Sequence, residues 1–175
     1  MGALGRRFRE LRDAGRRAFI PYVTAGYPEP QAVPRILALL TESGADVIEL
    51  GIPFSDPLAD GPVIQGASWE ALRHGVTPRR VLEWVEGFAR AGVPVVLFSY
   101  VNPVLRYGPA AFVRDAAAVG AAGLLLTDLP LGTDPDLEAS LRHPEVDLVR
   151  LVAPTTPPDR AREIARASQG FLYYI

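Results

Sequence analysis

Glu49 is the residue whose type and surroundings most favour chemistry. It stands in an apolar run, between Val47, Ile48, Leu50 and Ile52. Side chains alternate between the two faces of a strand, so if Ile48 and Leu50 face outer helices, Val47 and Glu49 point inward. A carboxylate there, with no Lys or Arg nearby in the sequence, loses hydration, and its pKa should rise toward neutral pH. The alternative is a strand-end Glu paired with an Arg from another segment.

A loop carboxylate follows Glu49 within a few residues. Asp56 and Asp60 both lie close to prolines. An Asp before Pro or Gly is usually part of a turn, so each alone favours a structural interpretation. Combined with Glu49, however, one of them would provide the second group that proton transfer on opposite sides of a substrate requires.

The elements that would position these carboxylates alternate along the chain. A leading amphipathic helix is expected over 1–17, with Leu4, Phe8 and Leu11 on one face. Apolar, β-rich runs predict strands at roughly 19–24, 46–50, 93–99, 122–127, 147–152 and 170–175. Amphipathic stretches between them predict helices near 31–43, 62–74, 78–91, 109–119, 134–142 and 158–168.

This order predicts an α/β fold with a parallel sheet, either doubly wound or a (β/α)8 TIM barrel. The dinucleotide-binding Gly-x-Gly-x-x-Gly fingerprint of a doubly wound fold is absent after the first strand, where the sequence is Thr24-Ala-Gly-Tyr-Pro28. Six units in 175 residues extrapolate to the length of a full barrel, about 250 residues. The chain also stops inside the apolar run 171–175. We therefore expect residues 1–175 to be a single incomplete barrel domain with strands 1–6.

Composition excludes several classes of function. The 18 basic residues are all Arg and balance 20 acidic ones, which is unlike the basic surface of a nucleic-acid-binding protein. No apolar run has the length of a membrane span. Without Lys or Cys there is no Schiff-base lysine or thiolate chemistry within this stretch. The only histidines, His74 and His143, are isolated and stand beside turn signals, so no metal site is expected.

The same alternation predicts which other side chains face the interior. They form a largely apolar and aromatic mouth that suits a flat hydrophobic ligand. An ordinary barrel core is the alternative, especially for the aliphatic members. The predicted inward residues are Tyr22, Thr24, Phe98, Tyr100, Leu125, Thr127, Leu151 and Tyr173.

Four segments resemble one known family along essentially the whole chain. They are Phe19-Ile-Pro-Tyr-Val-Thr-Ala-Gly-Tyr-Pro28, Val47-Ile-Glu-Leu-Gly-Ile-Pro-Phe-Ser-Asp-Pro-Leu-Ala-Asp-Gly-Pro-Val-Ile-Gln65, Ser99-Tyr-Val-Asn-Pro103 and Leu126-Thr-Asp-Leu-Pro130. All are similar to motifs of the tryptophan synthase α-subunit family, and the long second segment is the most specific.

The resemblance implies a lyase of tryptophan biosynthesis. Its substrate would be indole-3-glycerol phosphate, cleaved to indole and glyceraldehyde 3-phosphate by a retro-aldol reaction without a metal or an organic cofactor. Glu49 matches the general acid/base, Asp60 the carboxylate that holds the indole N–H, and Tyr173 a tyrosine near the acid/base. Family substrate-pocket positions fall on Tyr22, Phe98, Tyr100, Leu125, Thr127 and Leu151, of which Phe98 and Thr127 differ in type from the family's usual residues.

A partner is implied as well. In the family, indole passes to a β subunit that carries pyridoxal phosphate, in a cytoplasmic α2β2 heterotetramer. The regions expected to contact that subunit fall on Pro53, Asp56, Pro57 and Pro130. The family's phosphate-binding residues belong to the seventh and eighth units, beyond Ile175.

Two other functions remain open from the sequence. One is a different phosphosugar barrel, an epimerase or isomerase, although the metal-dependent ones need inward His ligands that this chain lacks. The other is a non-catalytic barrel that binds and activates a β subunit while its own site is idle. The presence of both Glu49 and Asp60 argues against this second reading.

Overall fold

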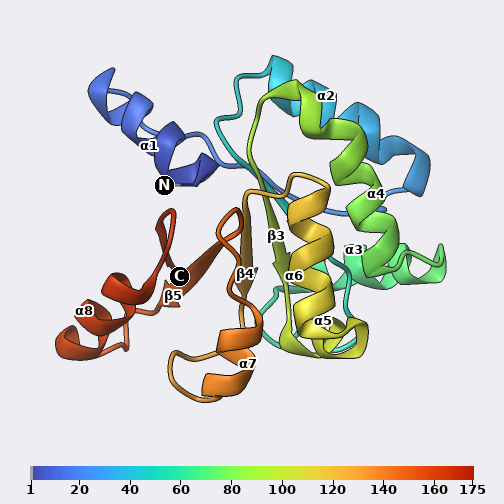
Figure 1. Ribbon diagram of the computed structural model, residues 1–175. Helices are drawn as coiled ribbons and strands as arrows, with labels where there is room; N and C mark the ends of the chain where they lie inside the picture. Colours follow the sequence, from blue (N-terminus) through green and yellow to red (C-terminus); the bar gives the residue numbers. More distant parts are fainter. Residues whose placement is uncertain (1) are drawn as a thin grey trace.

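Six parallel strands form part of a TIM barrel in the computed structural model, which describes residues 2–175 (Figure 1). Each strand pairs with the next in sequence, so the spatial order is β1 to β6 without a crossover. The strands are β1 (Tyr22–Thr24), β2 (Ile48–Gly51), β3 (Val95–Ser99), β4 (Gly123–Leu126), β5 (Asp147–Val152) and β6 (Leu172–Tyr174). The predicted order and parallel pairing are confirmed.

A leading helix precedes the first strand, and the other helices follow the strands and cover the outside of the sheet. They are α1 (Ala3–Asp13), α2 (Val33–Glu42), α3 (Pro62–Arg73), α4 (Pro78–Phe88), α5 (Val101–Tyr107), α6 (Pro109–Ala118), α7 (Pro135–Ser140) and α8 (Pro158–Ala167), with 3-10 turns η1 (Pro30–Ala32) and η2 (Ala89–Ala91). Proline in the first turn marks several starts, where its missing N–H is not needed. Thr77 caps α4 by accepting a hydrogen bond from the Arg80 N–H.

Helix α5 was not predicted from the sequence. It has seven residues, too few for a clear periodic pattern, and contains Pro103. Pro103 lies in the first turn, where proline is tolerated. The helix start is stabilised from another segment, because the Val101 N–H donates to Asp128 Oδ1 at 2.7 Å. A tertiary contact therefore supplies the cap that the local sequence lacks.

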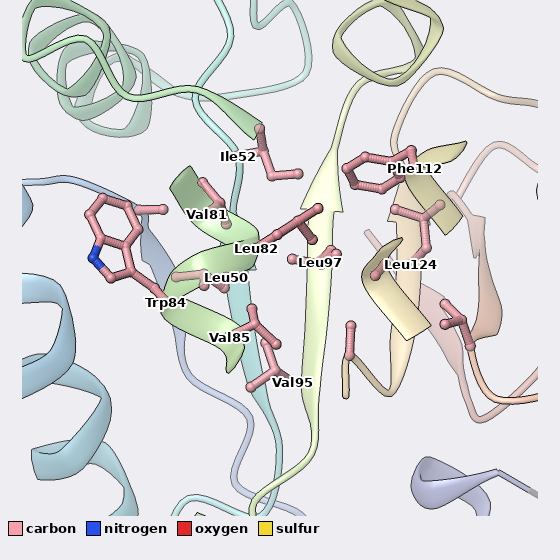
Figure 2. Packing of buried hydrophobic residues seen from close by; sticks show 14 of the residues in the cluster. Leu50, Ile52, Val81, Leu82, Trp84, Val85, Val95, Leu97, Phe112 and Leu124 are labelled. Atoms are coloured by element: carbon pink, nitrogen blue, oxygen red, sulfur yellow. The ribbon is translucent and has the colours of Figure 1, made fainter. Parts of the chain in front are cut away.

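Both faces of the central strands β2, β3 and β4 are buried, which explains their continuous apolar runs. The outer face carries Leu50, Leu97 and Leu124, which pack against α4 and α6 (Figure 2). The inner face carries Val47, Val96, Leu125 and Val149, with Tyr22, Phe98, Leu151 and Tyr173 packed beside them. The predicted alternation of side chains is thereby confirmed.

The leading helix packs against the amino ends of the strands. Leu4 is fully buried in the inner cluster. A methyl group built on Gly123, the first residue of β4, would lie 2.8 Å from Leu4 Cδ1, so the helix and the strand approach closely. Arg7 of the same helix forms an ion pair with Asp46, just before β2. The expectation of a packed leading helix is confirmed.

Candidate active site

Glu49 lies in the middle of β2 and faces the inner side of the sheet. Its strand partners are Tyr22 of β1 and Val96 of β3, and both belong to the inner cluster. The side chain is only 4% exposed. Within residues 2–175 it has no hydrogen bond and no ion pair. Glu49 is therefore an inward carboxyl group with no arginine beside it.

The environment of Glu49 changes its acidity. Burial raises the pKa of its carboxyl from 4.5 to about 7. A group with such a pKa is populated in both its protonated and ionised forms near neutral pH, which is the property of a general acid/base.

Asp60 approaches from the loop between β2 and α3. Its Oδ2 accepts a hydrogen bond from the Tyr100 hydroxyl at 3.1 Å. The loop itself is held by the Asp60 N–H, which donates to the Pro57 carbonyl at 3.0 Å, and by Gln65 Nε2, which donates to the Asp60 carbonyl at 2.8 Å. Burial raises the pKa of Asp60, while the hydrogen bond from Tyr100 opposes that rise.

Three aromatic rings line the inner face beside Glu49. Phe98 contacts Tyr22 edge-on, with ring centroids 5.3 Å apart, and Tyr173 on its other side at 5.9 Å. Burial raises the pKa of Tyr173, and the nearby charges of Glu49 and Asp60 add to the rise. Burial likewise raises the pKa of Tyr22 to about 12, with smaller contributions from the same two carboxylates. The predicted carboxylates and tyrosines therefore lie within electrostatic reach of one another.

The remaining predicted pocket residues differ in how far they reach the interior. Leu125 is fully buried in the inner cluster, and Leu151 is half-buried beside it. The Thr127 hydroxyl and N–H both donate to the Ser99 carbonyl, so this residue ties β4 to β3. Tyr100 is buried, and its hydroxyl contacts the Asp60 loop.

The residues expected at a partner interface lie around the same end of the sheet. Asp56 and Pro130 are exposed and Pro57 is half-buried, whereas Pro53 is buried and does not reach the surface. Leu58, which follows Pro57 in the β2–α3 loop, is 93% exposed.

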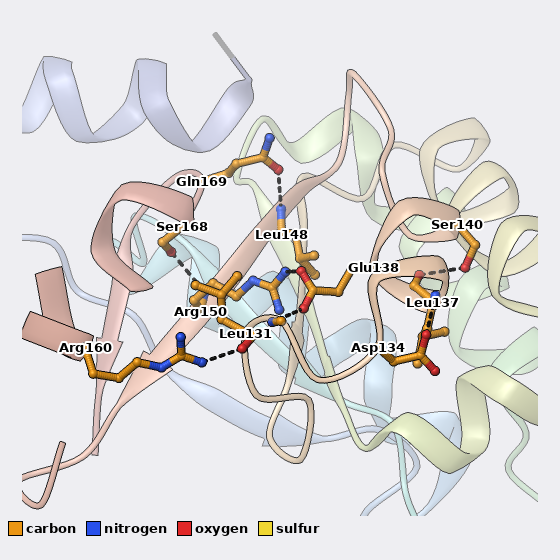
Figure 3. A network of polar contacts seen from close by, with 11 residues as sticks. Leu131, Asp134, Leu137, Glu138, Ser140, Leu148, Arg150, Arg160, Ser168 and Gln169 are labelled. Atoms are coloured by element: carbon orange, nitrogen blue, oxygen red, sulfur yellow. Dashed lines mark hydrogen bonds and ion pairs between the residues drawn. The ribbon is translucent and has the colours of Figure 1, made fainter. Parts of the chain in front are cut away.

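A buried ion pair on the opposite face was missed by the sequence analysis. Arg150 of β5 donates to Glu138 of α7 at 2.5 Å, and the Gly132 N–H donates to the same carboxylate (Figure 3). Ser168 and Gln169 accept hydrogen bonds from the β5 backbone alongside. An Arg within an apolar strand was the available signal, since alternation places it on the helix side. This network is structural in character.

No metal centre or membrane-spanning helix is found in the described part of the chain. Residues 2–175 contain no group of three His, Cys, Asp or Glu side chains arranged to hold a metal ion. No helix in that range is long and apolar enough to cross a membrane.

Comparison with known proteins supports one family. A family model for the tryptophan synthase alpha chain matches residues 8–175. The tryptophan synthase alpha chain of Acidovorax sp. (strain JS42) is 46% identical, over 100% of this chain and 67% of its own length. That of Prochlorococcus marinus is also 46% identical, over 98% of this chain and 65% of its own length. The chain thus spans about two thirds of the relatives it matches.

Solved structures agree. The crystal structure of tryptophan synthase subunit alpha from Legionella pneumophila superposes with a TM-score of 0.94 at 37% identity, covering 100% of this chain and 68% of that one. An aminoacrylate-bound form of tryptophan synthase from M. tuberculosis gives 0.94 at 42% identity, covering 99% and 71%. With the inward Glu49 and the matching family model, these likenesses show that the chain belongs to the tryptophan synthase alpha chain family, the lyases that cleave indole-3-glycerol phosphate in tryptophan biosynthesis.

Proposed function

We propose that this chain carries the acid/base site for cleaving indole-3-glycerol phosphate to indole and glyceraldehyde 3-phosphate. The observation that carries the proposal is Glu49, a buried inward carboxyl with a pKa of about 7 and no ion-pair partner among residues 2–175. A carboxylate neutralised by arginine would keep a low pKa and would be a poor proton donor.

Glu49 would perform both proton transfers of the retro-aldol reaction. In its protonated form it donates a proton to C3 of the indole ring, which leaves a positive charge shared with the ring nitrogen. The ionised Glu49 then removes the proton from the side-chain hydroxyl. The bond between C3 and the side chain breaks, its electron pair returns to the ring, and the hydroxyl carbon becomes the aldehyde. No net oxidation occurs, and the carboxyl ends in the state in which it began.

Asp60 would stabilise the charged intermediate. An anion beside the indole N–H lowers the free energy of the cation formed by C3 protonation, which is the kind of electrostatic stabilisation that accelerates such a step. The rings of Tyr22, Phe98 and Tyr173 offer the flat apolar surface that an indole ring requires. The Tyr173 hydroxyl would lie beside Glu49, because the charge of Glu49 contributes to the raised pKa of Tyr173.

The β2–α3 loop would also bind a partner. Leu58 is almost fully exposed and is flanked by the exposed Asp56 and the half-buried Pro57. Single exposed apolar residues are common, but this one stands in the loop that carries Asp60. We infer that the loop and Pro130 contact a pyridoxal-phosphate β subunit in an α2β2 complex, and that the protein is cytoplasmic. The alpha subunit itself would need no cofactor.

Indole release by the protein in its full natural length tests the proposal. Glu49→Gln keeps the size of the side chain but removes the acid, and we expect the rate to fall by about 10³-fold, within the range for general acid/base catalysis. Glu70→Gln, on the exposed face of α3, is the matched control and should leave the rate unchanged. Equal rates for wild type and Glu49→Gln would refute the proposal. Activation of a β subunit without any lyase activity would favour the non-catalytic alternative.

A further inference from the structure

The Tyr100 hydroxyl is held between two groups of the loop that carries Asp60. It accepts a hydrogen bond from the Ala59 N–H at 2.9 Å and donates one to Asp60 Oδ2 at 3.1 Å. The Tyr100 side chain is only 5% exposed. Its donor hydrogen and one of its two lone pairs are therefore engaged by adjacent residues of one loop.

The backbone around Tyr100 is fixed from the neighbouring strand. On one side, the Ser99 carbonyl accepts a hydrogen bond from the Thr127 N–H at 3.0 Å. On the other, the Val101 N–H donates to Asp128 Oδ1 at 2.7 Å. Both anchors come from the carboxyl end of β4, so the phenol extends from a rigid base toward the β2–α3 loop.

The ring of Tyr100 is supported as well. Phe54, at the start of the β2–α3 loop, lies with its ring centroid 5.2 Å from that of Tyr100. The same loop is thus held at two places, by the Phe54 ring contact near its start and by the hydroxyl at Ala59 and Asp60 near its end. Burial raises the pKa of the Tyr100 hydroxyl, which keeps the proton on the phenol.

We propose that Tyr100 is a positioning residue, whose hydroxyl fixes the Asp60 carboxylate in the orientation that the indole N–H requires. This inference rests on the proposed function, because it assigns Tyr100 a role through Asp60. A loop carboxylate that is free to rotate spends part of its time out of line with the ring nitrogen. The fixed one is ready to stabilise charge without rearrangement, which affects the chemical step more than substrate binding.

The matched pair Tyr100→Phe and Tyr107→Phe tests the inference in the full-length protein. Each substitution removes one tyrosine hydroxyl that donates to an aspartate, since the Tyr107 hydroxyl donates to Asp115 at 2.8 Å. For Tyr100→Phe we expect kcat to fall about 10- to 100-fold, the range for losing a hydrogen bond to a charged group, with KM changing less than about threefold. Tyr107→Phe should match wild type. An unchanged kcat in Tyr100→Phe would overturn the inference.

A double-mutant cycle shows whether Tyr100 acts through Asp60. In an Asp60→Asn background, Tyr100→Phe should lower kcat by less than about twofold, because the group it positions is already lost. An equal loss in both backgrounds would contradict the positioning role. If Asp60→Asn is too slow to assay, hydrogen exchange at the Ala59 amide replaces the cycle. It should speed up at least about tenfold in Tyr100→Phe and stay constant in Tyr107→Phe. An unchanged exchange rate would also overturn the inference.

Failure of this inference is distinguishable from failure of the proposed function. A wild-type protein that releases no indole would refute the function, whatever Tyr100 does. A protein whose activity disappears in Glu49→Gln but persists unchanged in Tyr100→Phe would keep the function and overturn only the positioning role.

Discussion

Asp46, just before β2, and Glu49, within it, are buried carboxylates three positions apart, and they have opposite surroundings. Asp46 is 1% exposed and accepts hydrogen bonds from the Phe19 N–H at 2.8 Å and from Arg7 at 2.6 Å. Arg16 lies 3.6 Å away. Glu49 is 4% exposed and has no such partner among residues 2–175.

The difference follows the position along the chain, because Asp46 lies before the first residue of β2 and Glu49 lies inside the barrel. In TIM barrels, chemistry is located at the carboxyl ends of the strands, and the amino ends serve stability. For Asp46, burial favours a higher pKa, but the Phe19 N–H and the two arginines outweigh it and lower the pKa. For Glu49, burial acts alone and raises the pKa. Burial by itself therefore does not decide the pKa of a carboxylate, because donors and cations beside the group can reverse its effect.

Replacing Glu49 by Gln should give the largest effect on activity and almost none on folding. A loss of about 10³-fold in rate corresponds to about 4 kcal/mol of transition-state stabilisation. The free energy of unfolding should stay constant or rise, because a neutral amide is less costly to bury than a carboxylate. Urea unfolding beside the indole assay checks both. A marked loss of stability would mean that Glu49 has a structural partner.

Replacing Asp46 by Asn should show the reverse pattern. It removes the anion of a partly buried ion pair whose arginines can still reach water, which costs about 1 to 2 kcal/mol in the free energy of unfolding, while the activity of the folded protein stays near wild type. Asp13→Asn, in an exposed contact with Arg12, is the control and should change stability by less than about 0.5 kcal/mol. Equal midpoints for the two variants in urea would remove the structural role assigned to Asp46.

The two carboxylates should also respond to pH in opposite directions. The pKa of Glu49 is raised on folding, so its favourable contribution is complete below about pH 4.5 and is lost as the pH rises through about 7. The pKa of Asp46 is lowered, so its contribution is present above its ordinary value of 3.8 and disappears as the pH falls below it. Relative to Glu49→Gln, the free energy of unfolding of the wild type should fall by roughly 2 to 3 kcal/mol between pH 4.5 and pH 7. Parallel pH curves for these two proteins would contradict the account.

A smaller effect on stability is expected from a substitution at Gly51, where the backbone of β2 lies against the Tyr22 ring. A methyl group on Gly51 would lie 2.1 Å from the Tyr22 hydroxyl oxygen, so Gly51→Ala must displace that ring. We expect the free energy of unfolding to fall by about 1 to 2 kcal/mol and the KM for the substrate to rise. Gly61→Ala is the control, since nothing lies within 4 Å of the added methyl group. Identical unfolding curves for both variants would show that Tyr22 has room to move.

The sequence predicted the strands and the inward face of Glu49, because the period of a strand is fixed by its backbone and survives any tertiary context. It did not predict α5, whose start depends on Asp128 from another strand. Nor did it indicate that Tyr100 holds Asp60, since the two are 40 residues apart and meet only when the loop folds back over β3. Asp46 was missed as a buried ion-pair partner for the same reason, because Arg7 lies 39 residues away. Contacts between distant loops and helix ends are set by the assembled barrel.

The pKa of the Glu49 carboxyl, measured by carbon-13 NMR with Glu49→Gln to assign the signal, tests the central claim most directly. We predict a titration midpoint of about 7, well above the ordinary 4.5. A midpoint at or below 4.5 would mean that Glu49 is hydrated or paired with a cation, and it would contradict the role of this residue as the acid/base of the site.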